Sequence, residues 1–256
     1  MSEHRPQLEI TRDAATAAAR AAEIVASRVA SGAAKVLGLA TGGTMVPVYA
    51  HLVAAVQARK LSFHGVTGFN LDEYVGVAPH LPASFHAYMR QHLFALTDFA
   101  PDHAHIPDGL APDLAAEASR YEMAIAQAGG IDLQLLGIGS NGHIGFNEPG
   151  SDFASRTRVV ELSEATRRAN AVAFPDGAVP EQALTMGVGT ILQARDILLL
   201  ATGVEKAGAI AAAIEGPLST DCPASALRLH QRVRIICDEA AASELDGPTA
   251  DIRRRA

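Results

Sequence analysis

A glycine-rich segment near the middle of the chain carries side chains that could transfer protons. Residues 137–150 read GIGSNGHIGFNEPG and follow an apolar run over residues 131–136, which predicts a buried strand. The segment holds one imidazole, His143, and one carboxylate, Glu148. Ligands of α/β proteins bind beyond the carboxyl ends of strands, so we expect this loop to reach a site. A histidine that takes and gives protons near neutral pH suits that position.

A second glycine-containing turn predicts an anion site. A strand pattern over residues 36–40 runs into a turn and a helix pattern, and the turn consists of Thr41, Gly42, Gly43 and Thr44. Backbone N–H groups at a helix start, together with threonine hydroxyls, can face a phosphate. An ordinary threonine-capped turn explains the same residues equally well. The spacing is neither that of a P-loop nor that of a dinucleotide fingerprint.

Two carboxylates, Asp72 and Glu73, follow another predicted strand over residues 66–70. A carboxylate there can abstract a proton beside a carbonyl if its pKa is tuned. Spacing alone favours a plainer interpretation, because Asp and Asn commonly close turns. Lys206 follows a strand pattern over residues 196–201. By itself it would be interpreted as a surface lysine.

Strand and helix patterns alternate along the chain and must position these side chains. Strands are predicted over residues 36–40, 66–70, 131–137, 196–201 and 233–237, and helices over residues 14–34, 46–57, 112–127, 205–215 and 239–245. This alternation predicts one α/β domain spanning residues 1–256, with a doubly wound, mostly parallel sheet and helices on both faces. Residues 151–185 are more polar and less regular. We expect them to form a lid-like excursion over the site.

Composition excludes several other classes of protein. The 256 residues are 48% hydrophobic and carry a net charge of −7, which disfavours nucleic acid as a partner. No run approaches the roughly 18 apolar residues of a membrane-spanning helix, and no signal region opens the chain, so a cytoplasmic protein is predicted. Two cysteines and ten scattered histidines suggest neither a disulfide framework nor a metal site. The basic residues 253–255 are interpreted as a solvated tail.

The glycine-rich loop resembles the signature of the glucosamine-6-phosphate deaminase (isomerase) family. The resemblance continues in family order from about residue 35 to residue 245. It covers LGLATGGT at 37–44, FNLDEYVG at 69–76, SFHAYM at 84–89, TMGVGT at 185–190 and CPAS at 222–225. A single match of this kind would be weak, whereas the ordered set is highly specific.

The resemblance implies conversion of D-glucosamine 6-phosphate and water to D-fructose 6-phosphate and ammonia, a step of amino-sugar catabolism. It assigns the turn at residues 41–44 and Lys206 to phosphate binding. It makes Asp72 the base that moves a proton between C1 and C2, and His143, supported by Glu148, the residue that opens the sugar ring. Glu73 is expected to orient its loop. The implied partner is a small amino-sugar phosphate, without metal or cofactor, and a homo-oligomer stays open because family members range from monomers to hexamers.

Two positions depart from the family pattern. Asn141 stands where many members have aspartate; it can orient His143 but cannot stabilise an imidazolium by charge, so His143 should stay neutral to lower pH. Val172 stands where well-studied members have an arginine that grips the phosphate. Arg168 lies one helical turn earlier and is our candidate to replace that arginine in part.

Three alternatives share the resemblance. Galactosamine 6-phosphate is a close rival substrate, since the loss at Val172 leaves room for it. 6-Phosphogluconolactonases share a Gly-His loop, but they typically show Asp-Glu-Arg where this chain has Asp72, Glu73 and Tyr74. Non-catalytic sugar-phosphate sensors carry an N-terminal DNA-binding module, and the residues before the first predicted strand are too few and too weakly basic for one.

Overall fold

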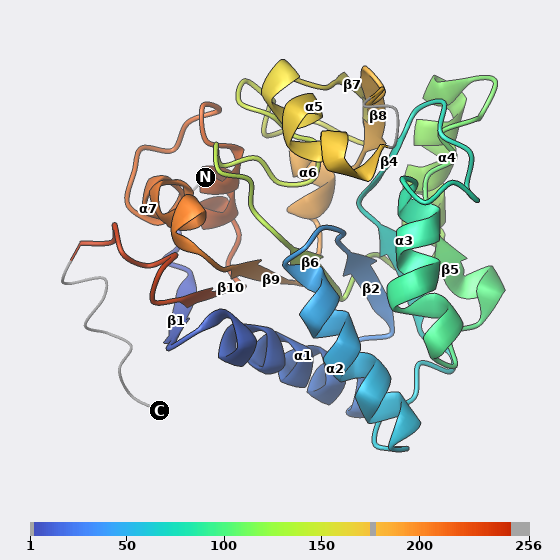
Figure 1. The fold of residues 1–256 in the computed structure, drawn as a ribbon, viewed down its shortest axis with the longest axis horizontal. Coiled ribbons are helices and arrows are strands. Elements are labelled where there is room, and N and C mark those ends of the chain that lie inside the picture. The colour runs from blue at the N-terminus through green and yellow to red at the C-terminus, as the bar shows by residue number, and fades with distance from the viewer. Residues whose placement is uncertain (1–2, 175–177, 247–256) are drawn as a thin grey trace.

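The computed structural model describes residues 3–174 and 178–246 (Figure 1). Its centre is a seven-stranded sheet in the order β1-β10-β9-β6-β2-β3-β5, in which every pairing is parallel. The predicted mostly parallel α/β fold is therefore confirmed. The strands are β1 (Gln7–Thr11), β2 (Val36–Leu39), β3 (Thr67–Asn70), β5 (Ala104–His105), β6 (Leu133–Leu136), β9 (Asp196–Ala201) and β10 (Val233–Asp238).

Helices cover the sheet because its central strands are apolar on both faces, as parallel sheets require. In Figure 1, α1 and α2 lie on one side of the sheet and α7 on the other. The α-helices are α1 (Ala14–Ala30), α2 (Met45–Gln57), α3 (Phe85–His92), α4 (Leu114–Gln127), α5 (Glu164–Asn170), α6 (Val188–Ile191) and α7 (Ala207–Ile214). Short 3-10 helices are η1 (Phe94–Leu96), η2 (Pro101–His103), η3 (Ala171–Ala173), η4 (Val204–Lys206) and η5 (Pro223–Leu229).

Local chemistry explains both ends of α1. Asp13 accepts a hydrogen bond from the Thr16 backbone N–H at 2.7 Å and so caps the first turn. The alanine-rich pattern predicted a helix to residue 34, but the helix ends at Ala30. Gly32 follows with a φ of 72°, a left-handed conformation that glycine tolerates and that stops a helix.

A second, antiparallel sheet lies beyond the carboxyl ends of the large one. It has the order β4-β8-β7, formed by β4 (Asp72–Tyr74), β8 (Gln182–Thr185) and β7 (Arg158–Glu161). The strand β4 follows β3 almost directly, so Asp72 sits where the chain passes from one sheet to the other. Together with α5 and η3, the strands β7 and β8 make up most of the predicted excursion at residues 151–185 (Figure 1).

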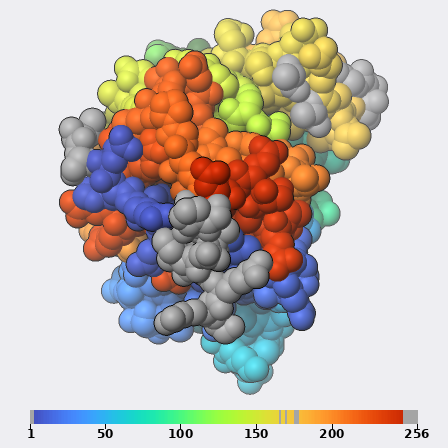
Figure 2. All heavy atoms as spheres, turned by 90° about the vertical axis from the view of Figure 1, so that its left-hand side faces the viewer, coloured from blue at the N-terminus to red at the C-terminus, as the bar shows by residue number. Residues whose placement is uncertain are grey.

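Two expectations about the ends of the chain need correction. The edge strand β1 was not predicted; it pairs with β10, and Figure 2 shows the blue N-terminal segment beside the orange and red C-terminal part. The helix predicted over residues 239–245 is replaced by consecutive turns. Asp238 ties this segment to another loop, because its carboxylate accepts from the N–H groups of Ala241 at 2.8 Å and Gly203 at 3.1 Å. A helix this short is also marginal by itself.

No helix in the described part of the chain is both long enough and apolar enough to span a bilayer. The basic residues 253–255 lie outside the described residues.

Candidate active site

A pocket of about 440 Å³ opens at the carboxyl ends of β2, β3 and β6. This is the edge of a parallel sheet where ligands bind. The pocket is built from the loops that follow these strands and from part of the excursion. Its lining includes most of the residues singled out from the sequence, namely Thr41, Gly42, Gly43, Thr44, Asp72, His143 and Lys206.

The turn after β2 has the form of an anion cradle. Gly42 has a φ of 103°, which favours glycine, and a side chain at Gly43 would meet only open space. Thr44 precedes α2, and its hydroxyl makes no helix-capping hydrogen bond, so it stays available to a ligand. Lys206 reaches the same pocket from η4, after β9. It is the one lysine or arginine among the described lining residues.

Asp72 is a buried carboxyl group that faces the pocket. The residue is 5% exposed, and its Oδ1 atom has no hydrogen-bond partner within the described structure. Burial raises the pKa of Asp72 to about 8, and the neighbouring charge of Glu73 adds to the rise. A carboxyl group poised in this way can take up and release a proton near neutral pH.

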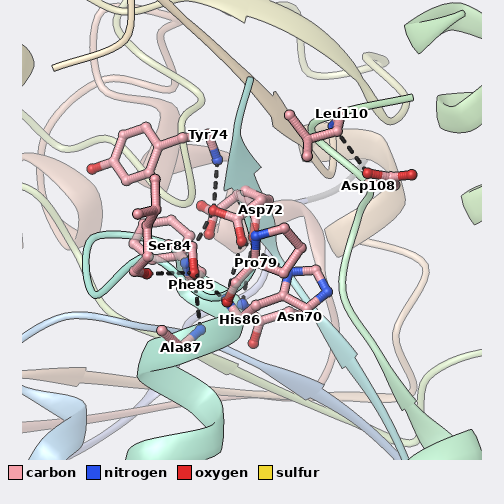
Figure 3. A network of polar contacts seen from close by, with 12 residues as sticks. Asn70, Asp72, Tyr74, Pro79, Ser84, Phe85, His86, Ala87, Asp108 and Leu110 are labelled. Atoms are coloured by element: carbon pink, nitrogen blue, oxygen red, sulfur yellow. Dashed lines mark hydrogen bonds and ion pairs between the residues drawn. The ribbon is translucent and has the colours of Figure 1, made fainter. Parts of the chain in front are cut away.

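Glu73 has a different environment although it is the next residue. Figure 3 shows this corner, where β4 meets the start of α3. The Glu73 carboxylate accepts from the backbone N–H groups of Tyr74 at 2.9 Å, Phe85 at 3.0 Å and His86 at 3.0 Å. The His86 Nδ1 atom also lies 3.0 Å from the Glu73 Oε2 atom. Glu73 thus satisfies the N-terminus of α3 and fixes the loop, the position expected for it.

His143 is held by a chain of polar contacts. Its Nδ1 lies 2.7 Å from Asn141 Oδ1, and Asn141 Nδ2 donates to Glu148 Oε2 at 2.8 Å. An amide oxygen only accepts, so Nδ1 carries the hydrogen and Nε2 is left as the basic nitrogen. Glu148 in turn accepts from the hydroxyl groups of Ser163, at 3.3 Å, and of Thr166. The chain therefore connects the first turn of α5 to the imidazole.

The pKa of His143 is lowered from its usual value. Burial of the ring is the main cause; the positive charge of Lys206 acts in the same direction, and Glu148 opposes both. The direction agrees with the expectation drawn from Asn141, although burial dominates. The ring also needs Gly139 beside it, because a Cβ at that position would lie 2.2 Å from the His143 Cε1 atom.

Comparison with known proteins places these features in a family. A family described as glucosamine-6-phosphate isomerases/6-phosphogluconolactonase matches residues 11–236. A glucosamine-6-phosphate deaminase of Rhodopirellula baltica is 52% identical over 241 residues, which cover 94% of this chain and 96% of the relative. The chain belongs to the glucosamine-6-phosphate isomerase/6-phosphogluconolactonase family.

Other members differ in how much they share with this chain. A glucosamine-6-phosphate deaminase 2 of Bacillus subtilis is 53% identical over 213 residues, covering 82% of this chain and 86% of the relative. A solved structure of a monomeric glucosamine-6-phosphate deaminase superposes with a TM-score of 0.90 at 47% identity, covering 93% of this chain and 99% of that one. A 6-phosphogluconolactonase of Trypanosoma cruzi reaches 0.77 at 22% identity, covering 95% and 98%, and shares the fold alone.

One residue predicted from the family resemblance lies apart from the pocket. Arg168 is exposed on α5 and does not belong to the pocket lining. Val172 is 99% exposed, whereas Asn170 and Ala173 from the same segment do line the pocket. Since α5 and η3 turn these residues to different sides, the structure does not bring Arg168 to the other site residues.

Tyr88 is a pocket residue to which sequence reasoning gave no role. Its hydroxyl donates to the Gly42 carbonyl oxygen at 2.8 Å and so ties α3 to the anion cradle. The signal was present, because Tyr88 stands in the matching segment at residues 84–89. No spacing argument connects it to Gly42, which is far away in the chain. Among the described residues, no group of three or more His, Cys, Asp or Glu side chains could hold a metal ion.

Proposed function

We propose that the protein is a glucosamine-6-phosphate deaminase, converting D-glucosamine 6-phosphate and water to D-fructose 6-phosphate and ammonia. One observation carries the proposal. A single pocket joins an anion cradle with Lys206 to a buried carboxyl group, Asp72, and an oriented imidazole, His143. A sugar phosphate held by its phosphate at the cradle would present its other end to these two proton-transfer groups. Relatives about half identical to the chain carry the same name.

The reaction needs proton transfers that these groups can perform. His143 moves the proton of the C1 hydroxyl to the ring oxygen, which opens the pyranose. Asp72 takes the proton from C2 and returns it to C1, while the C1 oxygen gains a proton and the C2 amino group loses one, so that the amino-aldehyde becomes an imine at C2 beside a C1 hydroxyl group. Water then adds to C2 and ammonia leaves, giving the ketose. A carboxyl group with a pKa of about 8 suits this shuttle, since it both binds and releases the proton.

The surroundings of Tyr74 favour deamination over lactone hydrolysis. Tyr74 stands where lactonases of similar sequence typically have arginine. Its ring packs against Phe85, Phe146 and Phe174, with ring centroids 4.9, 5.4 and 5.2 Å away. This wall of the pocket is aromatic and supplies no cation beside Asp72, so it is poorly suited to a second anionic centre.

We assign residues 151–185 the role of a lid over the pocket. The support is that Asn170 and Ala173 already line it and that Ser163 and Thr166 contact Glu148. In the described arrangement Arg168 is exposed and does not line the pocket. Arg168 would reach the phosphate in a closed form of the lid. In the open form, Lys206 supplies the positive charge for the phosphate.

Ammonia release in two matched variants tests the proposal. Asp72→Asn keeps the shape of the side chain but cannot take up the C2 proton, so we expect kcat to fall by about 10³-fold or more. Asp102→Asn, an exposed aspartate on η2 outside the pocket, should leave kcat unchanged. In the wild type, kcat/KM should rise with pH up to about 8, as Asp72 ionises. Equal ammonia release by both variants would contradict the assigned role.

A further inference from the structure

A second pocket, of about 550 Å³, lies at the opposite edge of the large sheet. The active-site pocket follows the carboxyl ends of the strands, whereas this one includes the first residues of β1, β6, β9 and β10. One face of α1 closes its side. Its charged and polar lining consists of Arg5, Gln7, Arg20, Glu23, Ser27, Arg28, Asp196, Gln231, Arg232 and Arg234. We call it the arginine pocket. It shares no lining residue with the active site.

The arginine pocket has a charge opposite to that of the whole chain. Its lining holds five guanidinium groups and two carboxylates, Glu23 and Asp196, and a third carboxylate, Glu9, pairs with Arg20 at 2.7 Å, so these residues carry two net positive charges. The chain carries a net charge of −7. A surplus of positive charge in a hollow of the surface attracts anions.

The carboxylates are spread unevenly over these arginines, and both Glu9 and Glu23 pair with Arg20. The Asp196 carboxylate contacts both Arg28 and Arg232, and the Arg232 Nε atom lies 3.4 Å from Asp196 Oδ1. Arg234 contacts only a neutral group within the described structure, the Gln7 Oε1 atom at 3.0 Å. Arg234 therefore keeps guanidinium donors that can bind an anion.

The fold holds these side chains in place. Arg20 and Arg28 project from one face of α1, two turns apart, and their side chains are 35% and 36% exposed. Arg234 is fixed by the pairing of β1 with β10, where Gln7 lies opposite it. An anion entering the pocket would therefore meet partly ordered guanidinium groups, at a lower entropic cost than flexible surface arginines would impose.

We propose that the arginine pocket binds a small polyanion with two or more phosphate or carboxylate groups. The guanidinium fork pairs with either group through two parallel hydrogen bonds. The volume lies within the usual range for small-molecule sites. The site is additional to the deaminase pocket, and its occupancy does not depend on the proposed reaction.

Calorimetric titration at constant ionic strength tests this site, with inorganic pyrophosphate and citrate as probes. Lys206→Met serves as the parent protein, because it weakens binding of either probe at the active site. In this background Arg234→Gln should raise the Kd of the bound probe by about tenfold or more, the effect of one lost charge-assisted contact. Arg90→Gln, an exposed arginine on α3, is the matched control and should leave the Kd unchanged.

The outcomes separate the sources of binding. Saturable binding of pyrophosphate alone assigns phosphate chemistry to the pocket, and binding of citrate alone assigns carboxylate chemistry. Equal Kd values for Arg234→Gln and Arg90→Gln would overturn the proposal, as would the absence of saturable binding in the Lys206→Met parent. Arg28→Gln provides the same comparison if Arg234→Gln does not fold. None of these results bears on ammonia release, so the two proposals fail separately.

Discussion

Asp72 and Glu73 are neighbours in the sequence, yet the fold gives their carboxyl groups different environments. Glu73 accepts from three backbone N–H groups at the start of α3. Asp72 is buried with one oxygen atom unpartnered within the described structure. Hydrogen bonds stabilise a carboxylate, while burial destabilises it. At the scale of single residues, this contrast distinguishes Asp72, the proposed proton-transfer group, from Glu73, which fixes the loop.

Burial of Asp72 should make the folded protein sensitive to alkaline pH. Its pKa is about 8 in the folded state and near 3.8 when the chain is unfolded. The folded state therefore holds the proton more tightly. The stabilisation that protonated Asp72 contributes is fully present below about pH 4 and is lost as pH rises through 8. The Asp72→Asn variant has no ionisable side chain at this position, so its stability does not fall for this reason as pH rises. We expect the Tm of the variant minus that of the wild type to increase by a few degrees from pH 6 to pH 9, measured by thermal unfolding. A difference independent of pH would contradict a raised pKa.

The neutral partner of His143 offers an equally direct test. Asn141→Asp places a negative charge 2.7 Å from Nδ1, which stabilises the imidazolium and raises the pKa of His143. We expect the ring proton signals of His143 to titrate at a pH higher by about one unit, followed by nuclear magnetic resonance. Asn147→Asp is a useful control, because Asn147 is buried in the same loop but contacts Arg158 and backbone carbonyls instead. An unchanged titration in Asn141→Asp would show that Asn141 does not govern the ring.

Among the elements, α5 has the closest connection to the chemistry. Ser163 caps its first turn by accepting from the Thr166 backbone N–H at 3.1 Å. The hydroxyls of both residues also contact Glu148, which orients Asn141 and through it His143. Formation of this helix turn and orientation of the imidazole are therefore coupled through one carboxylate.

Loss of one hydroxyl should weaken this coupling. Thr166→Val keeps the shape of the side chain and removes the donor to Glu148. We expect kcat for ammonia release to fall roughly three- to tenfold with little change in KM, since a hydrogen bond to a charged group is lost. Thr97→Val, whose hydroxyl bonds the Leu93 carbonyl oxygen away from the pocket, should behave like the wild type. A change confined to KM would argue against positioning of His143.

Substitution of Arg168 tests whether residues 151–185 close over the pocket. Arg168 is exposed on α5 and outside the pocket lining, so under the proposed role of residues 151–185 it would contact the phosphate after closure. Closure predicts that Arg168→Ala raises KM for the phosphosugar several-fold while kcat stays within about twofold. The measurement is steady-state kinetics against the wild type. An unchanged KM would mean that Val172 is left without a substitute and that Lys206 is the sole cationic contact.

At the scale of the whole molecule, local pattern and long-range pairing contributed different parts of the fold. Residues 36–40, 66–70, 131–137 and 196–201 could be predicted as strands because buried parallel strands read as apolar runs. The strands β1, β4, β7 and β8 are short and owe their conformation to partners distant in sequence, so no local signal marked them. Helix α3 was missed for a similar reason, since Glu73 stabilises its start from another strand.

The residues of the site fall into the same two groups, those predictable from local sequence and those placed by long-range pairing. Thr41 to Thr44, Asp72, His143 and Lys206 lie at the ends of predicted strands, and parallel topology brings such ends together. Tyr88 and Asn170 enter from elements whose placement depends on the second sheet. The position of Arg168 depends on which face of α5 turns toward the pocket. A seven-residue helix with arginines on more than one side does not reveal that face in its sequence.

A side-by-side turnover assay of the purified wild-type protein is the decisive test of the proposed reaction. Its substrates are glucosamine 6-phosphate, galactosamine 6-phosphate and 6-phosphogluconolactone. One ammonia should be released for each fructose 6-phosphate formed from the gluco sugar. The kcat/KM for the gluco sugar should lie well above that for the galacto sugar, and the lactone should not be hydrolysed beyond its spontaneous rate. Rapid lactone hydrolysis, or folded protein that releases no ammonia from the gluco sugar, would contradict the proposed reaction.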